Sequence, residues 1–338
     1  MGRFTIPREE YMRSGHVGCQ GCGACNAMRY ALKALGPRTI ISIPACCWAV
    51  IPGVWPSRNL DIPLMNSAFE VTGASISGIR AGLDAQGKRD VQVVGWAGDG
   101  GTADIGIQAL SGMVERGTDV IYVMYDNEAY MNTGIQRSSS TPVGAWTTTT
   151  PVGSTGYWEA DEKKDVAEIM VAHRAPYVAT ANIAYPEDLV RKFRRAMEVR
   201  GPKFIQIYAP CPTGWRMDPS RTIEVARMAV TTHLWPQYEV DHGVYRINVK
   251  PKRTDFREYV KMQGRFRHLT ADFVEEWDRR TERNWETLLE KERFSGELVA
   301  KGLLPFRPLH GSSARTPGGI GTHSADLPAS GEATEDGE

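Results

Sequence analysis

Six cysteines stand out in this 338-residue chain, because five of them fall within thirty residues. Cys19, Cys22 and Cys25 follow at intervals of three, Cys46 and Cys47 are adjacent, and Cys211 stands far downstream. A secreted disulfide framework fits poorly, because the chain is long and its first residues are polar rather than an apolar export signal. Clustered thiols in a reducing compartment instead indicate metal or redox ligands.

A second set of reactive residue types surrounds a glycine-rich turn. Gly98-Asp99-Gly100-Gly101 follows an apolar run and precedes a helix pattern, and the next apolar run ends in Asp126-Asn127. Glycines let the backbone approach a diphosphate and adopt positive φ, and the following helix offers free N–H groups to anionic oxygens. Asp99 is suited to a divalent cation that bridges the phosphates, and oxygens from the second loop would complete octahedral Mg²⁺ coordination. A lone Gly-Asp-Gly is compatible with an ordinary turn, but the Asp-Asn loop nearly thirty residues later favours a cofactor site.

Both sets of residues lie where a parallel sheet would gather them. Apolar, β-branched runs predict strands at Thr39–Ile43, Val91–Gly95, Asp119–Tyr125, Tyr177–Ala181 and Lys203–Tyr208. Helix patterns lie between them, at Asn26–Leu35, Phe69–Ala85, Ala103–Arg116 and Glu187–Val199. This alternation predicts an α/β fold with a mostly parallel sheet and helices on both faces. Because the carboxyl ends of parallel strands meet at one edge, we expect Cys47 and Cys211 to converge there.

Composition excludes some classes of function. Lys plus Arg and Asp plus Glu number 40 each, so the formal net charge is zero. That balance argues against a protein that depends on phosphate contacts with nucleic acid. No apolar stretch approaches the roughly 20 residues of a transmembrane helix, so we expect a cytoplasmic protein that does not span a membrane.

The composition and the hydrophobic periodicity of the sequence change after Trp215. Residues 216–260 mix basic and aromatic side chains with little periodicity, and Thr270–Arg293 is a densely charged helix pattern. From about Pro305 the chain is rich in Gly, Ser, Pro and Ala and ends in acidic residues, which predicts a disordered tail. We therefore expect a cofactor-binding α/β domain over 1–215, a helical extension over 216–304 that packs on the core or on a partner, and a flexible tail over 305–338.

The glycine-rich turn and the Asp-Asn loop also carry a resemblance. Gly98-Asp99-Gly100 through Asp126-Asn127 is similar to the thiamine diphosphate signature, which begins Gly-Asp-Gly and ends in Asn. The longer strings, Gly-Asp-Gly-Gly-Thr-Ala-Asp-Ile-Gly and Tyr-Asp-Asn-Glu-Ala-Tyr-Met-Asn-Thr-Gly, resemble the β subunit of the 2-oxoacid:ferredoxin oxidoreductases, of which pyruvate:ferredoxin oxidoreductase is best known. The resemblance runs from about Gly15 to the segment Gln263-Gly-Arg-Phe-Arg-His-Leu.

The resemblance implies a role for each matching residue. The thiamine diphosphate-binding residues would be Gly98, Asp99, Gly100, Gly101, Asn127, Ala129 and Asn132. Mg²⁺ would be held by the side chains of Asp99 and Asn127 and by the carbonyl of Ala129. Asn132 matches the family asparagine that faces the thiazolium and the substrate, and it is the catalytic candidate.

The cysteines match the family as well. Cys19, Cys22, Cys47 and Cys211 correspond to the ligands of the [4Fe–4S] cluster nearest the thiamine. The choice of Cys47 over Cys46 rests on the likeness of Cys47-Trp-Ala-Val to the family motif, and Cys25, at the start of a helix pattern, is expected to be a buried free thiol. Zinc is the chemical alternative for four thiolates.

The expected reaction follows from these cofactors. It is the coenzyme A-dependent oxidative decarboxylation of a 2-oxoacid to acyl-CoA and CO₂, with electrons leaving through iron–sulfur clusters. Ala24 stands where pyruvate enzymes of this type often carry Glu, so pyruvate, a branched-chain acid and an aromatic acid such as phenylglyoxylate all stay open as substrates.

The chain has room for only half of a thiamine site. An α subunit with the pyrimidine-binding half-site, and a ferredoxin-like subunit or ferredoxin, are therefore implied as partners. Two alternatives remain, which are a non-oxidative thiamine-dependent decarboxylase or carboligase subunit with a structural metal site, and a thiolate–zinc structural module.

Overall fold

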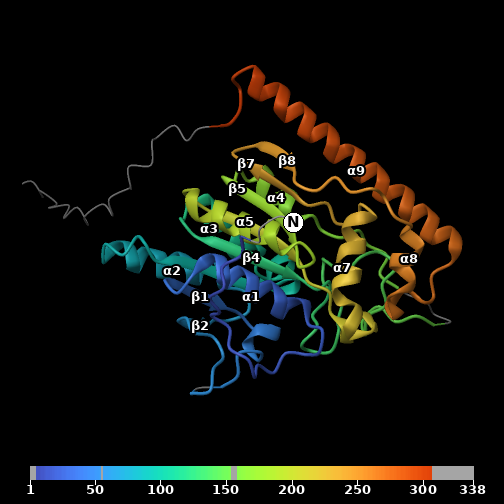
Figure 1. The fold of residues 1–338 in the computed structure, drawn as a ribbon, viewed down its shortest axis with the longest axis horizontal. Helices are drawn as coiled ribbons and strands as arrows, with labels where there is room; N and C mark the ends of the chain where they lie inside the picture. Colours follow the sequence, from blue (N-terminus) through green and yellow to red (C-terminus); the bar gives the residue numbers. More distant parts are fainter. Residues whose placement is uncertain (1–4, 55, 154–157, 307–338) are drawn as a thin grey trace, which may run out of the picture. The chain divides into compact units, whose positions relative to one another are not determined.

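A sheet of eight strands crosses the part of the chain that the computed structural model describes, residues 5–54, 56–153 and 158–306 (Figure 1). The strands are β1 (Thr39–Ile43), β2 (Leu64–Asn66), β3 (Gln92–Gly98), β4 (Ile121–Asp126), β5 (Tyr177–Asn182), β6 (Lys203–Tyr208), β7 (Tyr238–Asp241) and β8 (Val244–Ile247). Their order across the sheet is β2-β1-β3-β4-β6-β5-β7-β8. The first six strands in this order pair in parallel, and β7 and β8 add an antiparallel edge.

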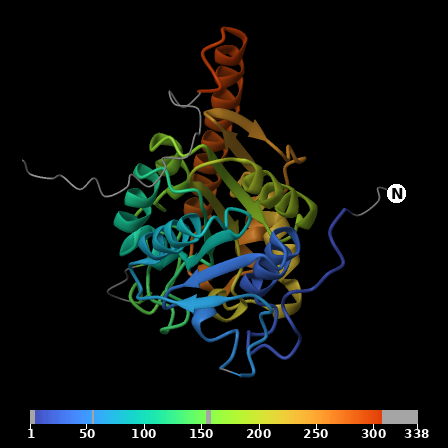
Figure 2. The same ribbon diagram turned by 90° about the vertical axis from the view of Figure 1, so that its left-hand side faces the viewer.

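Helices cover both faces of this sheet, so it has two hydrophobic cores. One core contains α1 (Gly23–Leu35), α5 (Pro186–Glu198) and α7 (Thr222–Thr231). The other contains α2 (Thr72–Ala85), α3 (Ile107–Glu115) and α4 (Val166–Ala172). In Figure 2, α2 and α3 lie to the left of the strands, and α1 and α5 lie to the right.

The central strands are apolar on both sides because each side faces a core. In β4, Ile121, Val123 and Tyr125 pack with α1 and α5, whereas Tyr122 and Met124 pack with α2 and α3. A strand buried on both faces needs a continuous apolar run rather than an alternating one. This is why β1, β3, β4, β5 and β6 could be predicted from the sequence.

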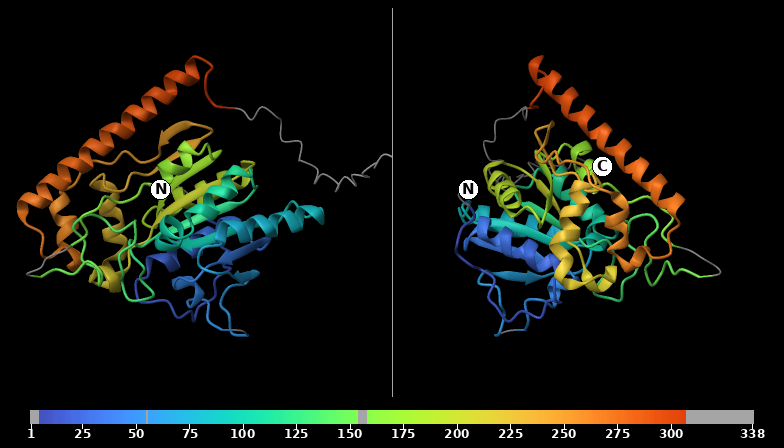
Figure 3. Two further views of the ribbon diagram at one scale, coloured as in Figure 1. Left: turned by 180° about the vertical axis from the view of Figure 1, so that it is seen from behind. Right: turned by 45° about the vertical axis from the view of Figure 1, so that its right-hand side comes forward.

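Residues after 215 extend the sheet and cover its edge. Besides α7, β7 and β8, this part contains α8 (Phe256–Lys261), the short helical turns η3 (Pro219–Arg221) and η4 (Gly264–Phe266), and α9 (Ala271–Ala300). The C-terminal half of α9 lies beside β8, where Ser295 accepts the N–H of Tyr245 and Glu292 accepts the N–H of Ile247, and α9 also contacts α8 (Figures 1 and 3). Thr270 caps the start of α9 by accepting a hydrogen bond from the N–H of Phe273 at 3.3 Å.

The structure confirms the predicted α/β fold with a mostly parallel sheet, helices on both faces and a C-terminal helix. The sequence reading missed β2, α4, α7, α8 and the β7–β8 hairpin, whose strands have only four residues each. The hairpin turns at His242 and Gly243, with φ of 49° and 85°, and His-Gly is a weak sequence signal for such a turn. The predicted tail lies almost entirely outside the described residues. Within them, no helix is long and apolar enough to cross a membrane.

Candidate functional site

The glycine-rich turn and the Asp-Asn loop leave the sheet at neighbouring strand ends. β3 and β4 are parallel, and Gly98 at the end of β3 pairs with Tyr125 near the end of β4. Asp99 therefore emerges beside Asn127, as expected for residues that follow parallel strands. After Asp99 the chain makes a π-helical segment, η2 (Gly100–Asp104), before α3 begins. Such segments are frequent at functional sites.

Three polar groups converge between these two loops. The side-chain amide of Asn127 lies 3.0 Å from the carbonyl oxygen of Ala129 and 2.9 Å from Oδ1 of Asp99, and its NH₂ group donates to both oxygens when it faces them. With a cation bound, rotation of the amide by half a turn would place its oxygen beside the other two. Adjacent ligands of an octahedral Mg²⁺ at 2.0–2.1 Å stand about 2.9 Å apart, so the donor set fits this ion.

Burial makes the Asp99 carboxylate expensive to ionise without a cation. The side chain is 1% exposed, and burial, reinforced by the charge of Asp126, raises its pKa well above the usual range. Oδ2 of Asp99 accepts a hydrogen bond of 2.5 Å from the hydroxyl of Ser138. Ser138 was not found by sequence reasoning, since a serine in a loop gives no signal of its own.

The glycines of the turn are required for close packing. A Cβ on Gly100 would lie 2.3 Å from the ring of Tyr130, and one on Gly101 would lie 3.1 Å from the ring of Phe69. Gly98, Gly100 and Gly101 do not have positive φ. The expectation that these positions need positive φ is therefore wrong, because β3 runs directly into η2 and space alone restricts the side chain.

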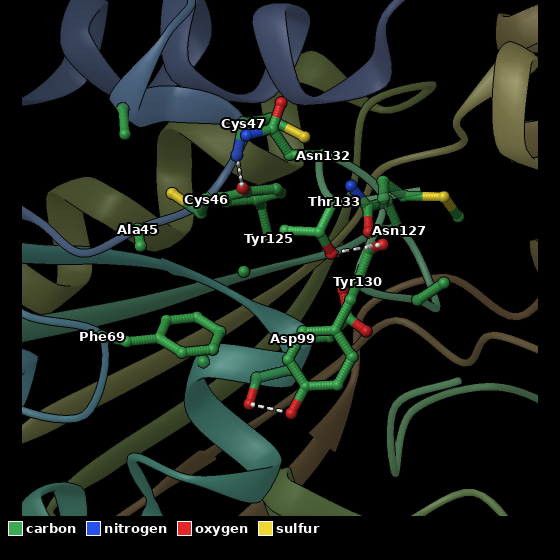
Figure 4. Close-up of a pocket in the computed structure, with 16 residues that line it drawn as sticks. Ala45, Cys46, Cys47, Phe69, Asp99, Tyr125, Asn127, Tyr130, Asn132 and Thr133 are labelled. Atoms are coloured by element: carbon green, nitrogen blue, oxygen red, sulfur yellow. Dashed lines mark hydrogen bonds between the residues drawn. The ribbon is translucent and has the colours of Figure 1, made fainter. Parts of the chain in front are cut away.

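A cavity of about 290 Å³ connects the oxygen atoms with the cysteine region (Figure 4). Its lining includes Cys46, Cys47, Phe69, Asp99, Asn127 and Asn132. The predicted catalytic residue Asn132 is exposed at this cavity. Tyr125 joins the two regions, because its hydroxyl accepts a hydrogen bond from the backbone N–H of Cys47 at 3.1 Å.

Two cysteine segments far apart in the chain pack directly against each other. Gly23, which follows Cys22, donates its N–H to the carbonyl of Pro210 at 3.0 Å, and Pro210 precedes Cys211. A Cβ on Gly23 would lie 2.7 Å from the backbone of Pro210. Cys211 then caps the one-turn helix α6 (Pro212–Trp215), where its sulfur accepts the N–H of Gly214 at 3.4 Å.

Three half-buried thiols have shifted pKa values. Burial, with the charges of Cys46, Cys211 and Cys22, raises the pKa of Cys47 to about 12. Burial also raises the pKa of Cys211 to about 11. A hydrogen bond from Cys25 lowers the pKa of Cys22 to about 7. These thiols are thus close enough for their charges to interact, as convergence at one edge of the sheet requires.

The remaining two cysteines lie close to the same thiols. Burial raises the pKa of Cys46, with Tyr125 and backbone N–H groups as partial offsets, and the charge of Cys46 contributes to the raised pKa of Cys47. Cys25 is 8% exposed in the first turn of α1, and a hydrogen bond with Cys22, burial and the charges of Cys22, Cys19 and Cys47 raise its pKa. Among the described residues, no three His, Cys, Asp or Glu side chains are close enough to hold one metal ion. Tetrahedral zinc would require thiolates about 3.8 Å apart, whereas a cubane spreads its ligands over four irons.

Comparison with known proteins agrees with this arrangement of strands and loops. Residues 56–207 match the family model for the thiamine pyrophosphate enzyme C-terminal TPP binding domain. A solved 2-oxoglutarate:ferredoxin oxidoreductase from Magnetococcus marinus has the same fold, with a TM-score of 0.52 over 66% of this chain and 82% of that chain, at 23% identity.

Relatives with much higher identity specify the family. The ketoisovalerate oxidoreductase subunit VorB of Pyrococcus furiosus is 54% identical over 294 residues, covering 85% of this chain and 94% of the relative. The pyruvate synthase subunit PorB of Methanocaldococcus jannaschii is 52% identical over 280 residues, covering 80% and 94%. Because identity of this level extends over nearly the whole of both relatives, the chain belongs to the β subunits of the 2-oxoacid:ferredoxin oxidoreductases.

Proposed function

We propose that this subunit binds the diphosphate of thiamine diphosphate through Mg²⁺ and a [4Fe–4S] cluster through four cysteines, for the coenzyme A-dependent oxidative decarboxylation of a 2-oxoacid. The observation that carries the proposal is the convergence of the Asn127 amide on Oδ1 of Asp99 at 2.9 Å and on the Ala129 carbonyl at 3.0 Å. Once the amide is rotated so that its oxygen faces them, this spacing is that of adjacent ligands of an octahedral cation. When bound, thiamine diphosphate supplies the electron sink for decarboxylation.

The residues around the oxygen atoms would prepare the site for the cofactor. Ser138 fixes the Asp99 carboxylate through Oδ2 and leaves Oδ1 free toward Asn127. The N–H groups at the start of η2 would attract the anionic oxygens of the diphosphate. Asn132, at the exposed side of the cavity, would donate a hydrogen bond to the carboxylate or carbonyl oxygen of the substrate.

We assign the cluster to Cys19, Cys22, Cys47 and Cys211. The packing of Gly23 on Pro210 supports the pairing of Cys22 with Cys211 in this set, and the choice of Cys47 over Cys46 rests on the likeness to the family motif. Cys46 and Cys47 both line the cavity that would hold the cofactor. A cluster at Cys47 would therefore lie beside the thiamine and accept its electrons singly. This proximity favours an oxidative reaction over the non-oxidative alternative.

The proposal requires partner subunits. The family match covers a thiamine-binding domain of one kind over residues 56–207, and we propose that an α subunit supplies the pyrimidine half-site. Electrons would pass on to a ferredoxin-like subunit or to ferredoxin. The names of the relatives make 2-ketoisovalerate and pyruvate the first substrates to test.

The test is anaerobic purification of the native complex, followed by assays with coenzyme A and a viologen dye. The panel contains 2-ketoisovalerate, pyruvate and phenylglyoxylate. We expect coenzyme A-dependent dye reduction with one of the first two acids. Decarboxylation without any dye reduction, in a complex with full iron content, would support the non-oxidative alternative instead.

A further inference from the structure

Two buried carboxylates flank Asn127 in the chain, and neither belongs to the group of Asp99, Asn127 and Ala129 proposed to hold Mg²⁺. Asp126 is 0% and Glu128 is 3% exposed. Nζ of Lys163 lies 2.8 Å from both, at Oδ2 of Asp126 and Oε1 of Glu128. Buried charges are costly unless they are paired, so a group of this kind beside candidate metal ligands calls for an explanation.

The second cation of this group comes from the segment that precedes α9. Arg265 is 2% exposed, and its Nη2 donates to Oε2 of Glu128 at 2.5 Å and to Oε1 of Gln263 at 2.8 Å. Both residues belong to the segment Gln263-Gly-Arg-Phe-Arg-His-Leu, which ends the family resemblance and has no role in the site as proposed. The guanidinium also lies over the indole of Trp215, 3.9 Å from the ring centre.

Trp215 closes a ring of contacts around the metal loop. Its indole N–H donates to the backbone carbonyl of Asn127 at 2.8 Å. Asn127 is bonded covalently to Glu128, which pairs with Arg265, which stacks on Trp215. We call Asn127, Glu128, Arg265 and Trp215 the arginine ring. Trp215 is also the last residue of α6, and its backbone N–H donates to the backbone carbonyl of Cys211 at 2.8 Å. The ring therefore joins the metal loop to a cluster-ligand segment.

The backbone at Glu128 has a strained conformation that the arginine ring would hold in place. Glu128 has φ of 67°, in the left-handed region that is unfavourable for a residue with a side chain. This turn brings the Asn127 side chain and the Ala129 carbonyl back toward the same point, 3.0 Å apart. Both carboxylate oxygens of Glu128 are held, Oε1 by Nζ of Lys163 and Oε2 by Nη2 of Arg265.

We propose that Arg265 is a positioning residue for both cofactors. It holds Glu128 in the left-handed turn, which places the Asn127 and Ala129 oxygens for Mg²⁺. Through Trp215 it also fixes the distance between this loop and Cys211. Neither Arg265 nor Trp215 lines the cavity, so both act through other residues. This inference rests on the proposed function.

A lysine cannot replace this arginine. The contacts combine a planar stack on an indole with donors directed to Glu128 and Gln263, and a lysine offers only a single ammonium on a flexible stem. Arg265→Lys therefore keeps the positive charge but removes the planar stack on Trp215 and the paired donors to Glu128 and Gln263. Trp215→Phe keeps an aromatic ring under the guanidinium and removes the N–H that binds Asn127.

The test uses the complete complex with its partner subunits, reconstituted anaerobically with iron and sulfide. The Mg²⁺ dependence of thiamine diphosphate binding is measured by calorimetry, and the reduction potential of the cluster by a redox titration followed by electron paramagnetic resonance. For both Arg265→Lys and Trp215→Phe we expect the Mg²⁺ concentration for half-saturation to rise about 10- to 100-fold. The cluster potential should also shift, at unchanged iron content.

A matched control separates positioning from stability. Lys203 is 3% exposed and pairs with Asp119 at 2.5 Å. It is the first residue of β6, whereas the site lies at the carboxyl ends of the strands, so the two are at opposite ends of the sheet. Lys203→Met should lower the melting temperature and leave both cofactor measurements as in the wild type. If the Arg265 and Trp215 variants change these two measurements no more than Lys203→Met does, the inference is wrong.

An Asp99→Ala variant of the same complex distinguishes this failure from failure of the proposed function. Loss of thiamine diphosphate binding in Asp99→Ala, with wild-type behaviour in both ring variants, would overturn only the arginine ring. Unchanged binding in Asp99→Ala would overturn the metal site itself, and the ring inference with it.

Discussion

The side-chain amide of Asn127 lies 2.9 Å from Oδ1 of Asp99, close enough to donate an N–H to it. A divalent cation would be held here by Oδ1 of Asp99 and, after rotation of the amide, by the side-chain oxygen of Asn127. Asp99→Ala should therefore abolish Mg²⁺-dependent binding of thiamine diphosphate while the iron content stays at the wild-type level. Calorimetry and iron analysis of the same preparation measure both quantities.

Asp104 provides the control for this substitution. Its carboxylate lies five residues from Asp99, and Oδ2 accepts hydrogen bonds from the hydroxyl of Tyr130 at 2.8 Å and from the N–H of Ser139 at 3.2 Å. An Asp104→Asn variant with its amide oxygen at this position can still accept both, and it should bind the cofactor almost normally. Full cofactor binding by Asp99→Ala would contradict the assignment of the metal site.

Single serine substitutions test the cluster ligands. Serine at Cys19, Cys22, Cys47 or Cys211 should lower the iron content and the 2-oxoacid-dependent reduction of the dye, because each removes one thiolate from the cubane. Serine at Cys25 or Cys46 should leave most of both. Loss of the cluster in Cys46→Ser but not in Cys47→Ser would reverse the choice within this pair.

A methyl group at Gly23 should separate the two cysteine segments. Gly23→Ala places a Cβ 2.7 Å from the backbone of Pro210, so the backbone has to move, at a cost of about 1–3 kcal/mol. Iron content should fall together with the free energy of unfolding, as measured by metal analysis and denaturant titration. Gly78→Ala is the control, because nothing lies within 4 Å of a Cβ there. In the middle of α2 it should stabilise the protein by about 0.5–1 kcal/mol.

The isolated subunit should not turn over any 2-oxoacid. Expressed alone and reconstituted with iron, sulfide, Mg²⁺ and thiamine diphosphate, it should bind the cofactor weakly, since we expect the pyrimidine half-site on the α subunit. Activity should appear when that subunit is added. Turnover by the isolated chain at the rate of the native complex would show that the half-site lies in this chain, and the subunit interpretation would have to be abandoned.

Stability at high pH should depend on Tyr122. This phenol is completely buried between β4 and the η2 turn, and burial raises its pKa to about 12. The folded state keeps it neutral while the unfolded chain ionises it near its usual pKa of about 10. Its contribution is therefore complete below pH 10 and is lost progressively as the pH rises toward 12.

Tyr122→Phe isolates this contribution. The free energy of unfolding should fall with pH above 10 less steeply in the variant than in the wild type, by about 1.4 kcal/mol per pH unit. Denaturant titrations between pH 8 and 12 give both slopes. Equal slopes would show that Tyr122 does not remain neutral in the folded protein.

Much of this protein could be predicted from local sequence alone. The five central parallel strands are continuous apolar runs because both of their faces are buried, and such runs need no knowledge of the rest of the chain. The positions of Asp99 and Asn127 follow from the same strands, since parallel strands end at one edge of the sheet. The family resemblance added the expectation of which cofactors bind and of which cysteines hold the cluster.

The residues that contact the metal loop from other parts of the chain could be identified only from the tertiary structure. Ser138 and Lys163 lie in irregular segments and Arg265 in the short turn η4, and no periodic pattern marks any of them. Arg265 reaches Glu128 across 137 residues of chain, and Gly23 meets Pro210 across an even longer interval. Contacts of this range depend on how the sheet and its extension pack, because burial and charge pairing are properties of the folded chain rather than of any short segment. The sequence thus determined the strands and the residue types of the site, and tertiary packing decided which side chains hold them in place.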